Sequence, residues 1–250
     1  QMKNIGIIGL GNIGGTLFEI WKEQEAFSII GCAKGDKVKE MVKQCKIIVI
    51  AVKPQSFAEL CAELKVDLSG KLIVSIMAGI KIATIREKLG VKKVVRAMPN
   101  LALKVRAGFT GWIASEEVEK SEKMIVQALF NYLGSELEVS EEEKLNALTA
   151  LSGSGPAYFY FLDYCMKLKA LEYGFSEEEA RKIVRSTFIG AAKLLDSSDI
   201  SAKEWIEKIS SKGGTTEAAI KIFTEEAQGA ILEAIEHAHK RAQELDKNSE

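Results

Sequence analysis

The chain has 250 residues, 47% of them hydrophobic, and a formal net charge of −1. This length and composition provide enough apolar surface for one large core or two modest ones. A net charge close to zero gives no electrostatic attraction to nucleic acid or to an anionic membrane, so we expect neither as a partner. No apolar run approaches the roughly 20 residues that a membrane-spanning helix needs.

The first half of the chain alternates short apolar runs, rich in β-branched residues, with helical patterns. Strands are expected at 3–9, 27–33, 46–52, 71–77 and 93–98, with further short ones at 108–115 and 136–139. Helical patterns cover 12–24, 55–64, 82–89 and 116–133. Nearly continuous apolar strands separated by helices predict a parallel sheet that is covered on both faces.

The character of the sequence changes near residue 140, after which no strand is expected. Helical patterns cover 141–173, 176–197, 201–210 and 215–246. The run FYFLDYCMKLKALEYG (159–174) is apolar on most sides, which predicts burial on most sides, partly by a partner subunit. We therefore divide the chain into an α/β domain at 1–140 and an all-α domain at 141–250.

The run GIIGLGNIGG contains Gly9, Gly11 and Gly14 in G-x-G-x-x-G spacing, after an apolar strand and at the start of a helix. In this context the spacing is typical of a Rossmann-like dinucleotide-binding domain. Gly9 permits the tight turn, Gly11 lets the backbone approach a pyrophosphate, and Gly14 lets the helix pack on the strand. The helix start, with Asn12 and Ile13, supplies amide donors for phosphate. A glycine-rich turn without a ligand is the alternative.

The end of the second expected strand indicates which dinucleotide the domain prefers. It reads Cys32-Ala33-Lys34-Gly35, without the acidic residue that usually holds the ribose 2′-hydroxyl of NAD. A basic group favours a 2′-phosphate, so Lys34 favours NADPH as the cofactor, with NADH as the second option. An ordinary surface lysine is the open alternative.

Two further strand ends carry candidate cofactor residues, because open α/β sheets bind ligands at the carboxyl ends of their strands. The segments are AVKPQ (51–55) and SIMAGI (75–80). In the second, small residues leave room for a flat ring. Tight strand-to-loop turns are the alternative for both. The candidates are Ala51, Val52, Lys53, Pro54, Ala78 and Gly79.

The run ALSGSGPAYF (150–159) predicts a flexible Gly-Ser-Gly turn before a long helix, with Ser154 as its N-cap. Further on, ISSKGGTTEAAI (209–220) interrupts the helical patterns. Gly213 and Gly214 place bare backbone before a helix that begins at the two following threonines. Unpaired amides, a helix dipole and a hydroxyl make an anion site that suits a small carboxylate. Simple N-capping is the alternative, although one threonine would satisfy it.

No metal site is expected. The four cysteines, Cys32, Cys45, Cys61 and Cys165, lack the paired spacing of zinc ligands. Such spacing is typical of buried thiols in a cytoplasmic protein, and the first residues lack the layout of a signal peptide. The two histidines, His237 and His239, are two residues apart in a helical pattern and so do not share a face.

Taken together and in this order, these motifs resemble pyrroline-5-carboxylate reductases over nearly the whole chain. The resemblance implies a Rossmann domain followed by a helical dimerisation domain that interlocks with its two-fold mate. It implies a homodimer, with active sites at the dimer interface, and a possible higher assembly of dimers. The implied reaction is reduction of the cyclic imine 1-pyrroline-5-carboxylate to L-proline by NAD(P)H, the last step of proline biosynthesis.

The resemblance also implies roles for particular residues. The substrate carboxylate would meet the backbone and hydroxyl groups of Ser211, Gly214, Thr215 and Thr216. Thr216 would also hydrogen-bond the ring nitrogen and is the candidate catalytic residue. Glu142 matches a family position near the substrate ring. The nicotinamide would lie near Lys53, Pro54 and Ala78.

The sequence departs from the family pattern at three places. Lys212 stands where the substrate loop usually has proline, and Leu101 and Ala102 stand where Thr-Pro is common. Between Lys34 and Ala51 the family usually has about one more strand–helix unit. The wall around the adenosine is therefore expected to be shortened.

Other functions compete with this one. The two-domain organisation also resembles that of β-hydroxyacid dehydrogenases, but Phe159 stands at the position of their acid/base lysine. Other imine reductases are harder to separate from the family by sequence. A catalytically silent relative that binds nucleotide is an alternative of a different class, motivated by the shortened adenosine wall.

Overall fold

The computed structural model describes residues 3–33 and 38–247, which form two compact units. One unit comprises residues up to 154 together with those from 237 onward, and the other comprises 155–236. Residues 141–154 and the end of the last helix therefore belong to the same compact unit as the sheet. As a division by function, the boundary at residue 140 stays a prediction.

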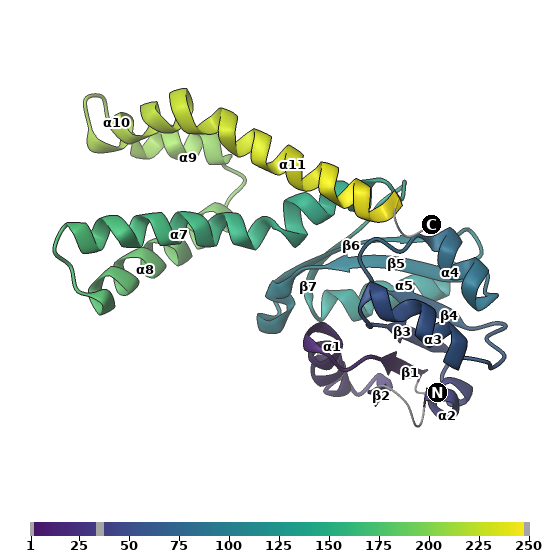
Figure 1. Ribbon diagram of the computed structural model, residues 1–250. Helices are drawn as coiled ribbons and strands as arrows, with labels where there is room; N and C mark the ends of the chain where they lie inside the picture. Colours follow the sequence, from purple (N-terminus) through teal and green to yellow (C-terminus); the bar gives the residue numbers. More distant parts are fainter. Residues whose placement is uncertain (1–2, 34–37, 248–250) are drawn as a thin grey trace. The chain divides into compact units, whose positions relative to one another are not determined.

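The first unit is built on a seven-stranded sheet with the order β2-β1-β3-β4-β5-β6-β7 (Figure 1). Strands β1 to β5 are parallel, β6 runs antiparallel to β5, and β7 is parallel to β6. The strands are β1 Lys3–Ile8, β2 Phe27–Cys32, β3 Ile47–Ile50, β4 Leu72–Ser75, β5 Val94–Pro99, β6 Gly108–Ala114 and β7 Gly134–Glu138. The predicted α/β class is confirmed.

Strand β6 runs antiparallel to β5 because the connection between the two strands is short. Between β5 and β6 lie only residues 100–107, which include the short 3₁₀ helix η2, Leu101–Val105. A parallel crossover needs about a dozen residues or more, so β6 must turn back beside β5. Helix α5, Lys120–Asn131, then provides the crossover that makes β7 parallel to β6.

Helices cover both faces of the sheet, which explains why its strands are apolar throughout. Helices α1 (Asn12–Lys22) and α5 pack on one face with alternate strand residues such as Ile47 and Val49. The other face carries Ile48 and Ile50. The helices packed there are α2 Val38–Gln44, α3 Phe57–Glu63 and α4 Ile82–Leu89.

The sheet is short on the side of β2. Strand β3 pairs with β1 on the side opposite β2, and in the described part of the connection between β2 and β3 the only helix is α2. Among the residues that the structure describes, no strand lies beyond β2. On this side the described sheet therefore ends at β2.

The expected Gly-Ser-Gly turn before the long helix is wrong. Helix α6, Lys144–Leu148, continues through the π-helical turn η3, Thr149–Gly153, into α7, Gly155–Glu172. Ser154 has helical backbone angles and its amide bonds to the Thr149 carbonyl at 2.8 Å, so it is not an N-cap. A wider turn suits Pro156, which has no amide for the preceding turn and whose ring needs space there.

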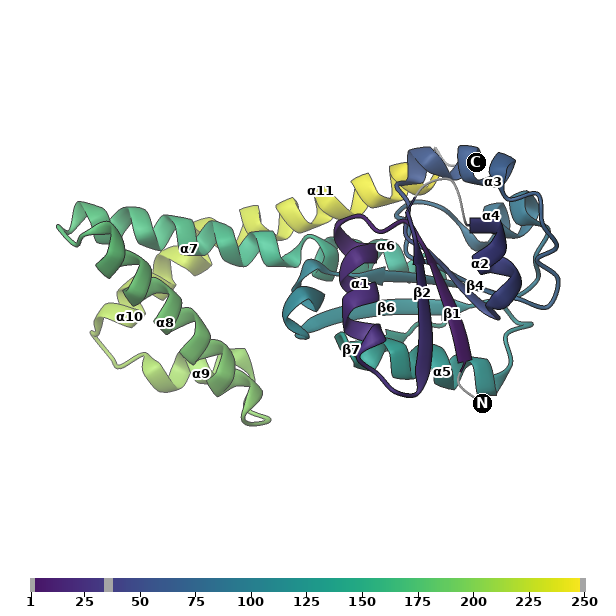
Figure 2. The same cartoon turned by 90° about the horizontal axis from the view of Figure 1, so that it is seen from below.

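The second unit contains only helices (Figures 1 and 2). Helices α7 and α8 lie side by side as a hairpin, and the rings of Phe159 and Phe188 meet edge to face at 6.5 Å. A capping box of Ser176 and Glu179 begins α8. The remaining elements are α8 Glu177–Asp196, α9 Ala202–Ile209, α10 Thr215–Ile222, the π turn η4 Phe223–Ala227 and α11 Gln228–Lys247. Helix α11 begins in this unit and ends in the first.

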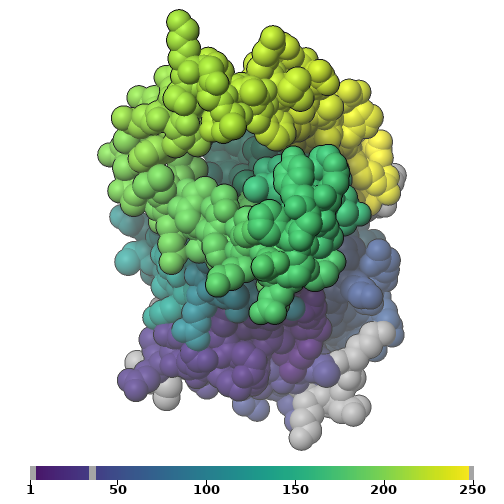
Figure 3. Space-filling view, turned by 90° about the vertical axis from the view of Figure 1, so that its left-hand side faces the viewer, coloured from purple at the N-terminus to yellow at the C-terminus, as the bar shows by residue number. Residues whose placement is uncertain are grey.

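Helix α7 exposes an apolar face in the single chain. Figure 3 looks onto the helices of this unit, with the α7–α8 hairpin in green. Tyr160 and Phe161 are 66% and 69% exposed, and Phe159, Tyr164 and Leu168 are exposed beside them. A patch of this kind marks an interaction surface. In the described part of the chain, no helix is both long enough and apolar enough to pass through a bilayer.

Candidate active site

The glycine loop after β1 is closed on one side and open on the other. Gly9 has φ +95°, and a Cβ there would lie 2.9 Å from the Ala51 carbonyl. A Cβ on Gly14 would lie 1.9 Å from the Gly9 oxygen, so only glycine fits. A Cβ on Gly11 would meet nothing within 4 Å. The loop therefore packs tightly on β3 and presents bare backbone outward, which is the surface that a pyrophosphate needs.

The start of α1 adds donors to this open side. Gly11 is the N-cap, with extended backbone and no side-chain cap, and the first helical bond joins the Gly15 amide to the Gly11 carbonyl. The amides of Asn12, Ile13 and Gly14 therefore have no acceptor within the helix. Lys104 donates to Asn12 Oδ1 at 2.5 Å and brings a positive charge there. No local pattern marked Lys104, which is far from the loop in sequence.

The other expected cofactor residues lie at the same edge of the sheet. The Ala51 amide bonds to the Ile8 carbonyl at 2.8 Å, and the 3₁₀ helix η1, Pro54–Ser56, follows Lys53. After β4, Ala78 is exposed and Gly79 has φ +74°. Parallel strands β1, β3 and β4 all end here, at the point where β1 separates β2 from β3. Lys34 lies outside the described residues.

A buried polar cluster, which the sequence did not predict, lies at the ends of β4 and β5. Arg96 on β5 is 5% exposed and donates to Asp246 at 2.6 and 3.3 Å and to Glu142 at 2.8 Å. Burial lowers the pKa of Arg96, but the hydrogen bonds to Asp246 and Glu142 outweigh it and raise that pKa above its usual range. Asp246 also accepts from Asn146 at 3.0 Å. The guanidinium is therefore charged, and it is held between two carboxylates.

Glu142, expected near the substrate ring, belongs to this cluster. Its Oε1 accepts from Arg96 and from the Ile82 amide, at 2.8 and 2.9 Å. Nearby, Asn100 after β5 donates to the Ser152 hydroxyl at 3.1 Å, which joins the end of β5 to the π turn η3. Glu142 lies in the first unit, whereas the loop at 211–216 lies in the second. Its contact with substrate stays a prediction.

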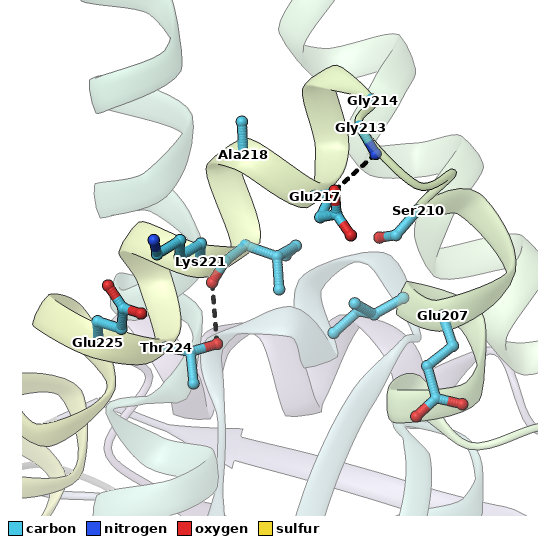
Figure 4. A pocket seen from close by; sticks show the side chains of 11 residues that line it. Glu207, Ser210, Gly213, Gly214, Glu217, Ala218, Lys221, Thr224 and Glu225 are labelled. Carbon is cyan, nitrogen blue, oxygen red and sulfur yellow. Dashed lines mark hydrogen bonds between the residues drawn. The ribbon is translucent and has the colours of Figure 1, made fainter.

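The loop before α10 has its two glycines before the helix start, as the sequence predicted, but the expectation of unpaired amides is wrong for both of them. Gly213 has φ +74°, and Gly214 is an extended N-cap without a side-chain cap. The Gly214 amide bonds to the Ser211 carbonyl at 2.9 Å, and the Gly213 amide bonds to Glu217 Oε2 at 2.7 Å. Figure 4 shows that carboxylate turned toward Gly213. The carboxylate of Glu217 thus already accepts from the loop backbone.

A cavity of about 620 Å³ lies beside the loop, between α9 and α10. Gly213 and Gly214 line it, whereas Ser211, Thr215 and Thr216 do not. The hydroxyl of Ser210, also in the lining, is buried and has no hydrogen-bond partner within the described residues. The threonines start α10, with Thr215 exposed and Thr216 half-buried. The structure therefore gathers the loop glycines at the cavity but leaves Ser211, Thr215 and Thr216 outside its lining.

An open α/β sheet with a glycine loop at the start of α1, joined to a helical unit with a second glycine loop before α10, is typical of nucleotide-dependent enzymes of the Rossmann class. The family model described as pyrroline-5-carboxylate reductase dimerisation matches residues 142–245. A second, described as NADP oxidoreductase coenzyme F420-dependent, matches residues 32–79. The chain belongs to the pyrroline-5-carboxylate reductase family, as the relatives below establish, and the expected resemblance is confirmed.

Relatives match over almost the full length. The pyrroline-5-carboxylate reductase of Aquifex aeolicus is 32% identical over 260 residues, covering 96% of this chain and 97% of its own. That of Pseudomonas aeruginosa is 37% identical, covering 82% of this chain and 77% of its own. The solved Plasmodium falciparum pyrroline carboxylate reductase, with NADP bound, is 26% identical, with a TM-score of 0.88 over 98% of this chain and 100% of its own. The Coxiella burnetii enzyme is 27% identical, with a TM-score of 0.86 over 98% and 99%.

Proposed function

We propose that this protein reduces 1-pyrroline-5-carboxylate to L-proline with NADPH, and with NADH as a poorer donor. The observation that carries the proposal is the family match over nearly the whole chain, with both loops retained in sequence: Gly9 to Gly14 and Gly213 to Thr216. A protein that only binds nucleotide would not need the second loop.

The first unit fits the cofactor. The open backbone at Gly11, the amides of Asn12 and Ile13 and the charge of Lys104 would hold the pyrophosphate. The strand ends would hold the nicotinamide half, through Ala51, Val52, Lys53, Pro54, Ala78 and Gly79. Lys34 would meet the 2′-phosphate. When bound, the reduced nicotinamide supplies a hydride to the imine carbon.

The second unit supplies the substrate side. The amides of Thr215 and Thr216 and the hydroxyls of Ser211 and Thr215 would bind the carboxylate, together with Gly214 once its amide exchanges the Ser211 carbonyl for the ligand. The Thr216 hydroxyl would orient the ring nitrogen. A proton reaches that nitrogen from solvent, so no proton-donating side chain is needed. Glu142 would approach the substrate ring from the first unit. In this scheme residues 1–140 form the cofactor domain and 141–250 the dimerisation and substrate domain.

We place the reaction in a homodimer. The chain carries the family's dimerisation domain, and the exposed apolar face of α7 offers the surface for it. A higher assembly of such dimers is part of the proposal. So is a cytoplasmic location, because each of the four cysteines carries a thiol rather than a disulfide.

The test is consumption of NADPH and NADH by the purified protein, with and without 1-pyrroline-5-carboxylate. Substrate-dependent consumption with equimolar proline would support the reaction, and the two rates would rank the cofactors. A folded protein that binds NADPH but makes no proline would favour another imine substrate. A folded protein that binds either cofactor weakly and reduces no imine would favour the silent relative, for which the short sheet edge at β2 is the supporting observation.

A further inference from the structure

The Arg96 cluster joins three segments that are far apart in the chain. Arg96 lies on β5, Glu142 precedes α6, and Asp246 lies in the last turn of α11. The side chains of Arg96 and Asp246 are 5% and 7% exposed, and they form a two-pronged ion pair with a shortest distance of 2.6 Å. A fork-shaped guanidinium bond of this kind fixes orientation as well as distance. The last turn of α11 is therefore fixed on the sheet.

Neutral hydrogen-bond donors stabilise the negative charge that the single guanidinium leaves on the two carboxylates. Two carboxylates face one guanidinium, and each carboxylate receives one further hydrogen bond. Asn146 donates to Asp246, and the Ile82 amide, in the first turn of α4, donates to Glu142 at 2.9 Å. The positive end of the α4 dipole also faces Glu142. Removing one charge would leave its buried partners uncompensated, so the cluster acts as one rigid part.

The position of the cluster gives it a second consequence. Arg96 pairs in the sheet with Ser75, the last residue of β4, after which residues 76–81 lead to α4. Glu142 holds the far end of that connection at Ile82. Its middle lies against α11, because a Cβ on Gly79 would be 3.1 Å from the Leu245 carbonyl. The segment that carries Ala78 and Gly79 is thus fixed at Ile82 by Glu142 and packed at Gly79 against Leu245 of α11.

We propose that Asp246 is a positioning residue for the nicotinamide half of the cofactor. It acts through Arg96 and Glu142, and through the helix turn that it anchors, to fix the loop between β4 and α4. The inference rests on the proposed function for its assignment of that loop to the nicotinamide. Asp246 itself touches neither cofactor nor substrate in this scheme.

The test compares two ligands that differ only in the nicotinamide half. NADPH spans both halves of the site, whereas 2′-phospho-ADP-ribose lacks the nicotinamide and uses only the glycine loop and the adenosine wall. The variant is Asp246→Asn, which keeps size and removes charge. The matched control is Glu244→Gln, which removes a carboxylate from the same turn, where Glu244 pairs with Arg241 and is 60% exposed.

For Asp246→Asn we expect weaker NADPH binding in a fluorescence titration and unchanged binding of 2′-phospho-ADP-ribose. Turnover with saturating substrate should show kcat/KM for NADPH lowered by about 10- to 100-fold, as a misplacement of about 1 Å produces. Glu244→Gln should match wild type in every measurement. A purely structural role would lower the melting temperature but affect both ligands equally below it.

Equal effects on the two ligands, or none on either, would overturn the proposal. Should Asp246→Asn fail to fold, Asn146→Ala removes only one hydrogen bond of the cluster and should show the same selective loss in smaller degree. The ligand titrations need no substrate. A wild-type protein that binds both ligands but makes no proline would therefore count against the proposed reaction alone, and one that binds neither would contradict both proposals.

Discussion

Three glycines that look equivalent in the motif have different physical reasons to be glycine. Gly14 has no room for a Cβ, Gly9 has both a positive φ and a close carbonyl, and Gly11 has open space with φ −71°. Packing and backbone conformation therefore require glycine at Gly9 and Gly14. At Gly11 only a bound ligand requires it, so a methyl group there tests ligand binding separately from folding.

We expect Gly11→Ala to fold with wild-type stability and to lose affinity for NADPH. Gly14→Ala should be destabilised by about 1–3 kcal/mol or more, because the added methyl overlaps the Gly9 carbonyl. Thermal melting and an NADPH titration check the pair. A melting temperature lowered as far in Gly11→Ala as in Gly14→Ala would contradict this assignment, as would unaltered NADPH binding in Gly11→Ala.

Thr216 is the one hydroxyl to which the proposed function gives a role at the reacting nitrogen. Thr216→Val keeps the shape of the side chain and removes the hydroxyl, whereas Thr216→Ser keeps the hydroxyl. A hydrogen bond to a charged group contributes about 1.5–3 kcal/mol, so Thr216→Val should lower kcat/KM by about 10- to 100-fold. Thr216→Ser should stay close to wild type. Steady-state kinetics with 1-pyrroline-5-carboxylate decides, and equal activity of all three proteins would remove Thr216 from the mechanism.

At this scale the sequence predicted the loops but not the cluster. Glycine spacing, helix starts and small residues at strand ends are local patterns, and the structure brings the glycine loop, Ala51 and Gly79 to one edge of the sheet. Arg96 and Asp246 are separated by 150 positions, so no local pattern could pair them. In the sequence, Asp246 is one of several charged residues near the end of the last helical pattern.

At the scale of elements, periodicity located most helices and strands. It did not predict the direction of a strand after a short connection or the way in which one helix continues into the next. The apolar strands β1, β3, β4 and β5 were each expected within a few residues of where they lie. The direction of β6 depended on the length of one connection. The π turn at 149–153 depended on how a proline is accommodated after Gly153, which residue type alone does not reveal.

The exposed face of α7 gives a prediction about assembly. Phe161 is 69% exposed in the single chain, and a buried aromatic at the centre of an interface typically contributes about 2 kcal/mol or more. We expect Phe161→Glu to weaken dimerisation by at least about 30-fold, which follows from that energy. Sedimentation at graded concentrations measures it.

Met124→Glu is the matched control, since Met124 is 62% exposed on α5 in the other unit. It should leave the association constant unchanged. Dissociation of both variants would indicate a general effect of added charge. Dimers of unchanged stability in Phe161→Glu would show that α7 is not the interface.

At the scale of the whole molecule, helix α11 connects the two functional parts. It begins next to the π turn that follows α10 in the second unit and ends at Asp246 in the first. The sequence predicted one long final helix but not that its last turn belongs to the nucleotide-binding unit. That membership follows from long-range packing and one buried ion pair, neither of which leaves a periodic signal.

The short sheet edge concentrates cofactor choice on few residues. Because β2 is the outermost described strand, the groups available to the adenosine come from the glycine loop and from the segment after Cys32. Lys34 is the basic residue nearest the end of β2 in sequence. We therefore expect this one side chain to carry most of the preference for a 2′-phosphate.

Lys34→Ala should lower the affinity for NADPH by about 10-fold or more, since a hydrogen bond to a charged group contributes about 1.5–3 kcal/mol. The affinity for NADH, which has a hydroxyl at that position, should change little. Lys39→Ala, an exposed lysine on α2 in the same connection, is the control and should leave both affinities unchanged. Titration with each cofactor gives the ratio. If Lys34→Ala weakens both cofactors alike, or neither, Lys34 is an ordinary surface lysine and the short edge selects its cofactor by other groups.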